Sequence, residues 1–65
     1  MNESVRNRIE MQLRLKKMSQ KDLAEKLGVT EVTVSRWLNG ERDPSIETLN
    51  RIAEALGTTT SYFFI

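Results

Sequence analysis

The chain has 65 residues, of which 38% are hydrophobic and 29% are charged, and ten Lys and Arg residues stand against nine Asp and Glu residues. A chain this short builds one core, which excludes a two-domain enzyme. It contains neither cysteine nor histidine, which excludes a disulfide framework, a thiolate zinc site and the commonest general base. We therefore expect one small water-soluble domain, residues 1–65, with no metal, no cofactor, no small-molecule substrate and no catalytic activity.

The positive charges gather toward the start of the chain. Residues 1–28 hold seven Lys or Arg against four Asp or Glu (net +3), residues 29–42 hold two of each (net 0), and residues 43–65 hold one against three (net −2). The longest uninterrupted apolar run, Tyr62–Ile65, is far shorter than a membrane span or the core of a signal peptide. We therefore expect a cytoplasmic protein with no membrane partner and a positive N-terminal half.

Apolar residues recur at helical spacing along the chain. No useful stretch alternates between apolar and polar residues as a half-buried strand does. A first helix is predicted from about Glu3 to Lys17, where Met11 and Leu15 widen an apolar face built at four-residue steps by Val5, Ile9 and Leu13.

Two short helices are predicted next. Ser19 is an N-cap with Asp22 as a weaker form of the capping box, and Gly28 ends the helix after a buried stripe made by Leu23, Ala24 and Leu27. Thr30 caps the following helix, and Gly40 ends it. The residues of this helix at positions i, i+3 and i+4, which we expect to face the core, are Val34, Trp37 and Leu38.

The rest of the chain predicts a loop and two more helical segments. Residues 40–44 form the loop, Ser45 restarts a helix and Gly57 stops it. The core-facing residues expected in that helix are Ile46, Leu49, Ile52, Ala53 and Leu56. Thr59 is positioned to cap a last short turn that carries three aromatic residues, Tyr62, Phe63 and Phe64. The predicted fold class is therefore all-α, with four or five short helices.

The segment from Gln20 to Asn39 is the most informative, because a single glycine turn separates its two helices and forces them to cross steeply. Ala24 is small where the helices approach most closely. With its inner face packed, the second of these helices presents an outer set near its N-terminus: Glu31, Val32, Thr33, Ser35 and Arg36. In DNA-binding versions of this motif, that end enters the major groove.

These residues resemble the lambda-repressor and Cro-like (XRE) helix-turn-helix family over nearly the whole chain. The matching segments are residues 18–29 (MSQKDLAEKLGV), 35–40 (SRWLNG), 44–45 (PS) and 52–57 (IAEALG). Lys17 departs from the pattern, since relatives often carry glycine ahead of the second helix. The resemblance implies a compact domain that binds double-stranded operator DNA as a homodimer and regulates transcription.

The resemblance also implies roles for individual residues. The base-facing positions are Glu31, Val32, Thr33 and Arg36. The Glu31 carboxylate suits cytosine, and the Val32 side chain suits the methyl group of thymine. The Thr33 hydroxyl suits a donor or an acceptor on a base edge, and the Arg36 guanidinium suits guanine. The phosphate-facing positions are Gln20, Ser35, Asn39 and Arg42, which set position without reading sequence.

Structural explanations compete with several of these roles. Gln20 is also explained as an ordinary surface residue, and Glu31 stabilises a helix N-terminus through the macrodipole whatever the helix binds. Arg36 is also suited to an exposed ion pair, although such pairs contribute only about 0 to 1 kcal/mol. Trp37 is a candidate base-stacking platform, but its spacing favours the core.

The aromatic C-terminus also has two interpretations. Its apolar residues either lie back on the domain or form an association surface, because an exposed apolar cluster usually marks one. The second interpretation predicts a homodimer interface made by Tyr62, Phe63, Phe64 and Ile65.

The leading functional hypothesis is a sequence-specific DNA-binding transcriptional regulator, a repressor, that reads operator half-sites in the major groove. The alternative is a protein-interaction module, such as an antitoxin or accessory subunit, that uses the same surface or the C-terminal aromatics. An enzyme is the third and weakest hypothesis, because the sequence contains no phosphate-binding glycine loop and no nucleophile elbow.

Overall fold

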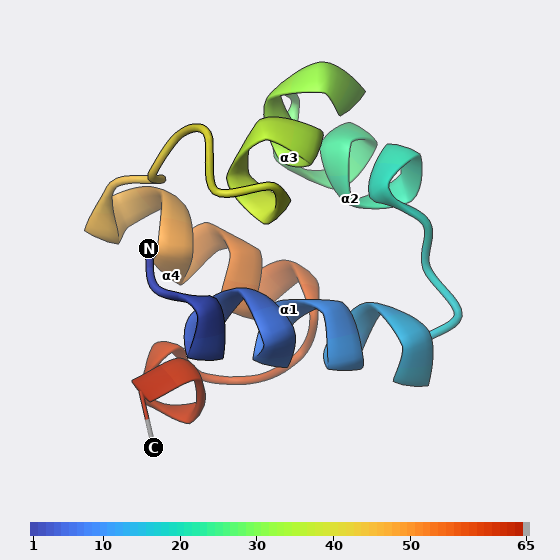
Figure 1. Cartoon of the computed structure of the whole chain (residues 1–65). Helices are drawn as coiled ribbons and strands as arrows, with labels where there is room; N and C mark the ends of the chain where they lie inside the picture. The colour runs from blue at the N-terminus through green and yellow to red at the C-terminus, as the bar shows by residue number, and fades with distance from the viewer. Residues whose placement is uncertain (65) are drawn as a thin grey trace.

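The computed structural model describes residues 1–64 and contains four α-helices followed by a 3-10 helix (Figure 1). The α-helices are α1 (Glu3–Leu15), α2 (Gln20–Leu27), α3 (Glu31–Leu38) and α4 (Ile46–Ala55), and the 3-10 helix is η1 (Thr60–Phe64). The structure confirms the predicted all-α class, and no strand occurs in the described residues. In this same range, no helix is long and apolar enough to cross a membrane.

Each α-helix begins at a polar residue whose side chain accepts a backbone N–H from the first turn. These N-caps are Asn2, Ser19, Thr30 and Ser45. At α2 the exchange is reciprocal, because the Asp22 N–H donates to Ser19 Oγ at 3.0 Å and the Ser19 N–H donates to Asp22 Oδ2 at 2.9 Å. The Ser19 N–H, and after it the Ser19 side chain, favour the ionised carboxyl and lower the pKa of Asp22 below its ordinary value, and the nearby Lys21 adds to the effect.

The ends of α1 and α2 share one hydrogen-bond pattern but differ in the residue that turns the chain. At α2, Gly28 has φ 72°, and the Val29 N–H donates to Ala24 O at 3.0 Å. At α1, Lys17 has φ 55°, and the Met18 N–H donates to Leu13 O at 2.9 Å. Both are Schellman turns, which favour glycine at the left-handed position. The departure at Lys17 therefore changes the strain of the first connection and leaves its geometry intact.

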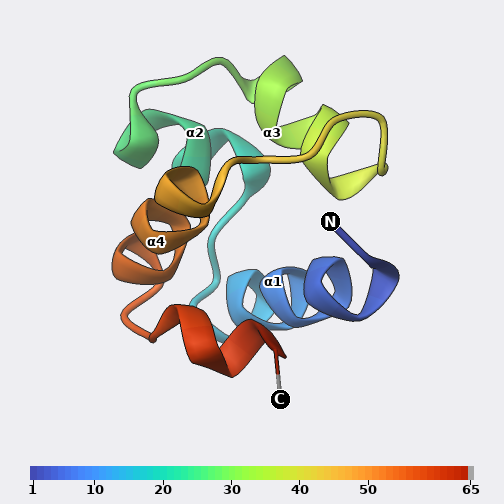
Figure 2. The same cartoon turned by 90° about the vertical axis from the view of Figure 1, so that its left-hand side faces the viewer.

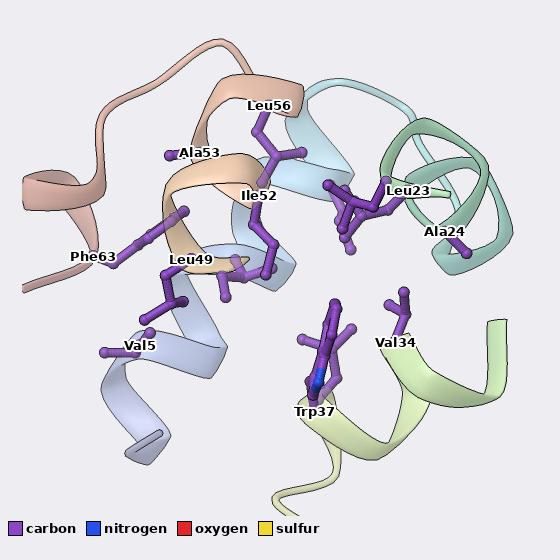
Figure 3. Packing of buried hydrophobic residues seen from close by; sticks show 14 residues of the cluster. Val5, Leu23, Ala24, Val34, Trp37, Leu49, Ile52, Ala53, Leu56 and Phe63 are labelled. Carbon is purple, nitrogen blue, oxygen red and sulfur yellow. The ribbon is translucent and has the colours of Figure 1, made fainter. Parts of the chain in front are cut away.

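The core is built from side chains of all four α-helices and of η1 (Figure 3). In Figure 1, α2 and α3 lie together at one side of the molecule and α1 lies at the other. The helix α4 packs against both α2 and η1. The fully buried side chains are Val5, Ile9, Leu23, Val34, Ile52, Leu56 and Phe63.

Three apolar side chains that we expected on inward faces are exposed instead. Met11 and Leu15 are 49% and 70% exposed. Each lies two residues beyond a core residue of α1, which places it about 200° around the helix and on the far side. Ile46, the first residue of α4, is 65% exposed.

The 3-10 helix η1 lies alongside α1 and closes the core from below α4 in Figure 2. Phe63 is 1% exposed and belongs to the core, whereas Tyr62 is half-buried. The Arg8 guanidinium lies 5.4 Å from the centroid of the Tyr62 ring and donates to the Tyr62 carbonyl oxygen. Thr60 Oγ1 also donates to Asn50 Oδ1 on α4. These contacts attach the C-terminal segment to two helices.

Candidate nucleic-acid interface

The helix pair α2–α3 is held together by apolar contacts around the glycine turn. Leu23 and Val34 are completely buried between the helices, and Ala24 is 3% exposed where the backbones approach. Val29 is half-buried against the same cluster. A directed bond adds to this packing, because Arg51 Nη2 on α4 donates to Leu27 O at the end of α2 over 2.6 Å. The orientation of the pair relative to α4 is therefore fixed by both packing and a charged hydrogen bond.

The two faces of α3 are clearly separated. Trp37 and Leu38 are each 8% exposed and point into the core, as the helical spacing predicted. Val32 is 58% exposed, and Glu31 and Arg36 are also exposed. The outer face therefore keeps a carboxylate, an apolar side chain and a guanidinium in solvent, which confirms that Arg36 projects away from the domain.

Two hydroxyl groups predicted on this outer face are only half-exposed and already have partners. Thr33 Oγ1 lies 2.9 Å from Thr30 Oγ1, and the Thr33 N–H donates to that same Thr30 oxygen. Ser35 Oγ accepts from Asn39 Nδ2 at 3.4 Å, one helical turn later. Both hydroxyls thus support the local geometry of α3 before any ligand binds.

The remaining predicted phosphate-facing residues lie at helix ends or in the loop. Gln20 is the first residue of α2, next to the N–H groups and the positive dipole end of that helix. Asn39 is the C-cap of α3, and Arg42 is exposed in the loop that follows. Such positions suit contacts to backbone phosphate.

The structure brings together a group that the sequence did not reveal. A hollow of about 240 Å³ lies between α3 and the following loop, and its lining residues are Thr33, Arg36, Trp37, Arg42 and Asp43. A Cβ atom at Gly40 would collide with the Arg6 guanidinium from α1, so a third arginine lies against the end of α3. The sequence predicts only part of this group. The four-residue spacing places Thr33 near Trp37 on α3, but it does not predict that the loop residues Arg42 and Asp43 lie beside them.

The predicted dimer residues divide into three groups. Phe64 is 57% exposed and Tyr62 is half-buried, so both remain accessible. The expectation for Phe63 is corrected, because this side chain fills the core beneath η1 and offers no surface to a partner. Ile65 lies outside the described residues.

Comparison with known sequences finds helix-turn-helix proteins and a repressor. Residues 9–63 match the helix-turn-helix family model. The 26 kDa repressor protein of Escherichia phage HK022 is 44% identical over 43 residues, which are 66% of this chain and 18% of that protein. An HTH-type transcriptional regulator of Methanocaldococcus jannaschii is 33% identical over 61 residues, which are 94% of this chain and 92% of that protein. The chain thus spans less than a fifth of the phage repressor.

Comparison with solved structures gives the same fold in two settings. The DNA-binding domain of the P22 C2 repressor superposes with a TM-score of 0.87 at 29% identity, covering 98% of this chain and 86% of that one. Hydroxypropylphosphonic acid epoxidase from S. wedmorenis superposes with a TM-score of 0.84 at 32% identity, covering 94% of this chain and 32% of the enzyme. With the family model matched over most of its length, the chain belongs to the XRE-type helix-turn-helix family.

Proposed function

We propose that this chain is a sequence-specific DNA-binding module of a transcriptional regulator, a repressor, with α3 as its recognition helix. One observation carries the proposal: α3 buries Val34, Trp37 and Leu38 while Glu31, Val32 and Arg36 stay in solvent. An α-helix fits the major groove of B-form DNA when one face is free of the domain. The phage HK022 repressor and the P22 C2 repressor domain, both similar to this chain, support the same function.

We assign a different base preference to each side chain on the outer face of α3. The Arg36 guanidinium is suited to a two-pronged contact with O6 and N7 of guanine, and the Val32 methyl groups are suited to the methyl group of thymine. Glu31 is suited to accept from the N4 amino group of cytosine. The Thr33 hydroxyl already interacts with Thr30, so we assign it a weaker role at the bases.

Backbone contacts then fix the register of the domain on the duplex. We assign them to Gln20, Ser35, Asn39 and Arg42, with the N–H groups of the first turn of α2 as further donors. Ser35 acts together with Asn39, since the two side chains are already bonded to each other. These residues contribute affinity that does not depend on the sequence of the DNA.

A single domain is small for operator recognition, so we propose a homodimer. Its principal extents are 27 × 24 × 19 Å, whereas half-sites one helical turn apart lie about 34 Å from centre to centre. Two copies placed side by side on one face of the duplex, with their longest axes in line, leave a gap of about 7 Å, which side chains at their edges are long enough to span. Tyr62, Phe64 and Ile65 are the proposed contact residues, and double-stranded DNA in the cytoplasm is the proposed partner.

The proposal is tested by selecting duplexes from a random pool with the recombinant chain at two salt concentrations. We expect a two-fold symmetric motif with half-sites about one helical turn apart. The affinity should fall steeply with salt, because binding to phosphates releases counterions. Recovery of unrelated sequences at both salt concentrations would contradict sequence-specific recognition.

A protein-interaction module is the second candidate function, and one observation favours it. Met11 and Leu15 are exposed on α1, on the side of that helix away from the core. A module of this kind would hold a protein partner and show no salt-dependent binding to any duplex in the same selection. No catalytic step is assigned to the chain under either proposal, and residues 1–64 contain no group of three acidic side chains able to hold a metal ion.

A further inference from the structure

Trp37, which lines the hollow beside α3, carries a polar group that the core does not use. Trp37 is 8% exposed and packs its ring against the buried cluster, yet it also lines the hollow between α3 and the loop. In Figure 3 the blue nitrogen of Trp37 lies at the end of the indole away from Ile52. The apolar part of the ring therefore faces the core, while its N–H group lies at the end of the ring nearest α3.

The indole N–H of Trp37 has no hydrogen-bond partner within the described residues. No buried side-chain nitrogen or oxygen in this part of the chain lacks a partner, so the Trp37 nitrogen is not fully covered and still reaches solvent. The indole nitrogen is a donor and cannot accept. A ligand that binds here must therefore supply an acceptor.

The other groups around the hollow favour an anionic acceptor. Two arginines, Arg36 and Arg42, line the hollow, and Asp43 is the one acidic residue among its lining residues. The Asp43 carboxylate is paired with the amino group of Met1, which compensates its negative charge. Donors therefore outnumber free acceptors at this place, and a phosphate oxygen is the chemical group that suits them.

We propose that the Trp37 indole N–H donates a hydrogen bond to a phosphate of the DNA backbone, beside the phosphate contact of Arg42. This inference rests on the proposed function, since it requires α3 to lie in the major groove. This contact gives Trp37 two roles. Its ring packs α3 against the core, and its nitrogen sets the distance between α3 and the sugar-phosphate backbone of the DNA. Arg36, one residue earlier, remains free to reach the base edges.

The first test uses the indole proton as a reporter. The chain contains one tryptophan, so the indole N–H gives a single NMR signal after ¹⁵N labelling. Titration with the selected duplex should move this signal strongly downfield and slow its exchange with water. An indole signal that keeps its position and its exchange rate while the backbone amides of α3 shift would overturn the inference and leave DNA binding intact.

The second test removes the donor without removing the ring. Chemical synthesis of this short chain allows Trp37 to be replaced by 3-benzothienylalanine, in which sulfur takes the place of the N–H group at nearly the same shape. We expect the affinity for the selected duplex to fall about tenfold, because a hydrogen bond to a charged acceptor is lost. The thermal midpoint should change little, since the apolar packing is retained.

The salt dependence of the DNA affinity distinguishes the contribution of Trp37 from that of Arg42. The benzothienyl chain should lose affinity with an unchanged slope of log affinity against log salt, because no charge is removed. The matched variant Arg42→Gln should lower the slope by about 1. Unchanged affinity of the benzothienyl chain, with the Arg42 effect present, would assign the phosphate contact to Arg42 alone and refute the role of Trp37. Absence of binding by the unmodified chain would instead refute the proposed function.

Discussion

The α2–α3 pair and the layer formed by α1 and η1 differ in how directly the sequence determines their surfaces. In the α2–α3 pair, the capping box of Ser19, the turn at Gly28 and the outward position of Arg36 all agree with the helical pattern. In the other layer, Leu15 is exposed and Phe63 is buried, against expectation. The comparison shows that capping residues and a packed inner face determine α2 and α3 locally, whereas the exposure of Leu15 and the burial of Phe63 depend on which other segments pack against them.

The largest expected effect lies in the layer formed by α1 and η1 and contrasts two neighbouring aromatic residues. Phe63→Ala should reduce the free energy of unfolding by about 3 to 5 kcal/mol, because it removes a fully buried ring and leaves a cavity. Phe64→Ala should change it by less than about 0.5 kcal/mol, since Phe64 is 57% exposed. Urea denaturation followed by circular dichroism measures both. Equal losses for the two variants would show that η1 does not bury Phe63 in this way.

The next effect belongs to the outer face of α3 and concerns binding alone. Arg36→Ala should weaken binding to the selected duplex by about 1 to 3 kcal/mol, because a two-pronged contact to one guanine is lost. The free energy of unfolding should stay the same, since the Arg36 side chain is exposed. Fluorescence anisotropy with a labelled duplex measures the affinity, and Gln20→Ala is the control that should weaken all duplexes alike.

A smaller effect concerns the strained end of α1. Lys17→Gly should raise the free energy of unfolding by about 1 kcal/mol, because glycine adopts a positive φ without the steric cost that lysine pays. Gly28→Ala is the reciprocal variant and should lower stability at the equivalent turn of α2. Thermal unfolding of the two variants beside the parent chain measures the pair. A lower midpoint for Lys17→Gly would contradict the left-handed conformation at this position.

The smallest effect is a pH dependence at the start of α2. The hydrogen bonds from Ser19 lower the pKa of Asp22 in the folded chain. The Asp22 carboxylate therefore stabilises the fold above its unfolded pKa of about 3.9, and this contribution is lost as the pH falls through the lower folded pKa. Urea denaturation from about pH 5 to about pH 2 should show the parent chain approaching the Asp22→Asn variant. A constant difference across this range would exclude Asp22 as the source.

Much of the fold follows from local signals in the sequence. The residues Ser19, Thr30 and Ser45 accept backbone hydrogen bonds where the sequence predicts helix starts. A polar N-cap is favoured there because the N–H groups of the first turn have no acceptor within the helix. Burial of Trp37 follows from its spacing with Val34. These features depend on neighbours within one or two helical turns, so a sequence pattern contains the information.

The features that the sequence did not predict depend on contacts outside the regular spacing of a single helix. The hollow at Trp37 requires the loop with Arg42 to fold back on α3, and the position of Arg6 over Gly40 requires α1 to cross its end. The burial of Phe63 depends on η1 meeting α1. The spacing of residues within one helix does not predict contacts between that helix and another segment. The DNA contacts assigned to α3 stay predictions.

The central claim, that the outer face of α3 reads DNA, is tested most directly by methyl NMR during titration with the selected duplex. The claim predicts that the signals of the Val32 methyl groups shift strongly while those of Leu15, exposed on α1, stay in place. Strong shifts at Leu15 and Met11 with unmoved Val32 signals would contradict it and place the binding surface on α1.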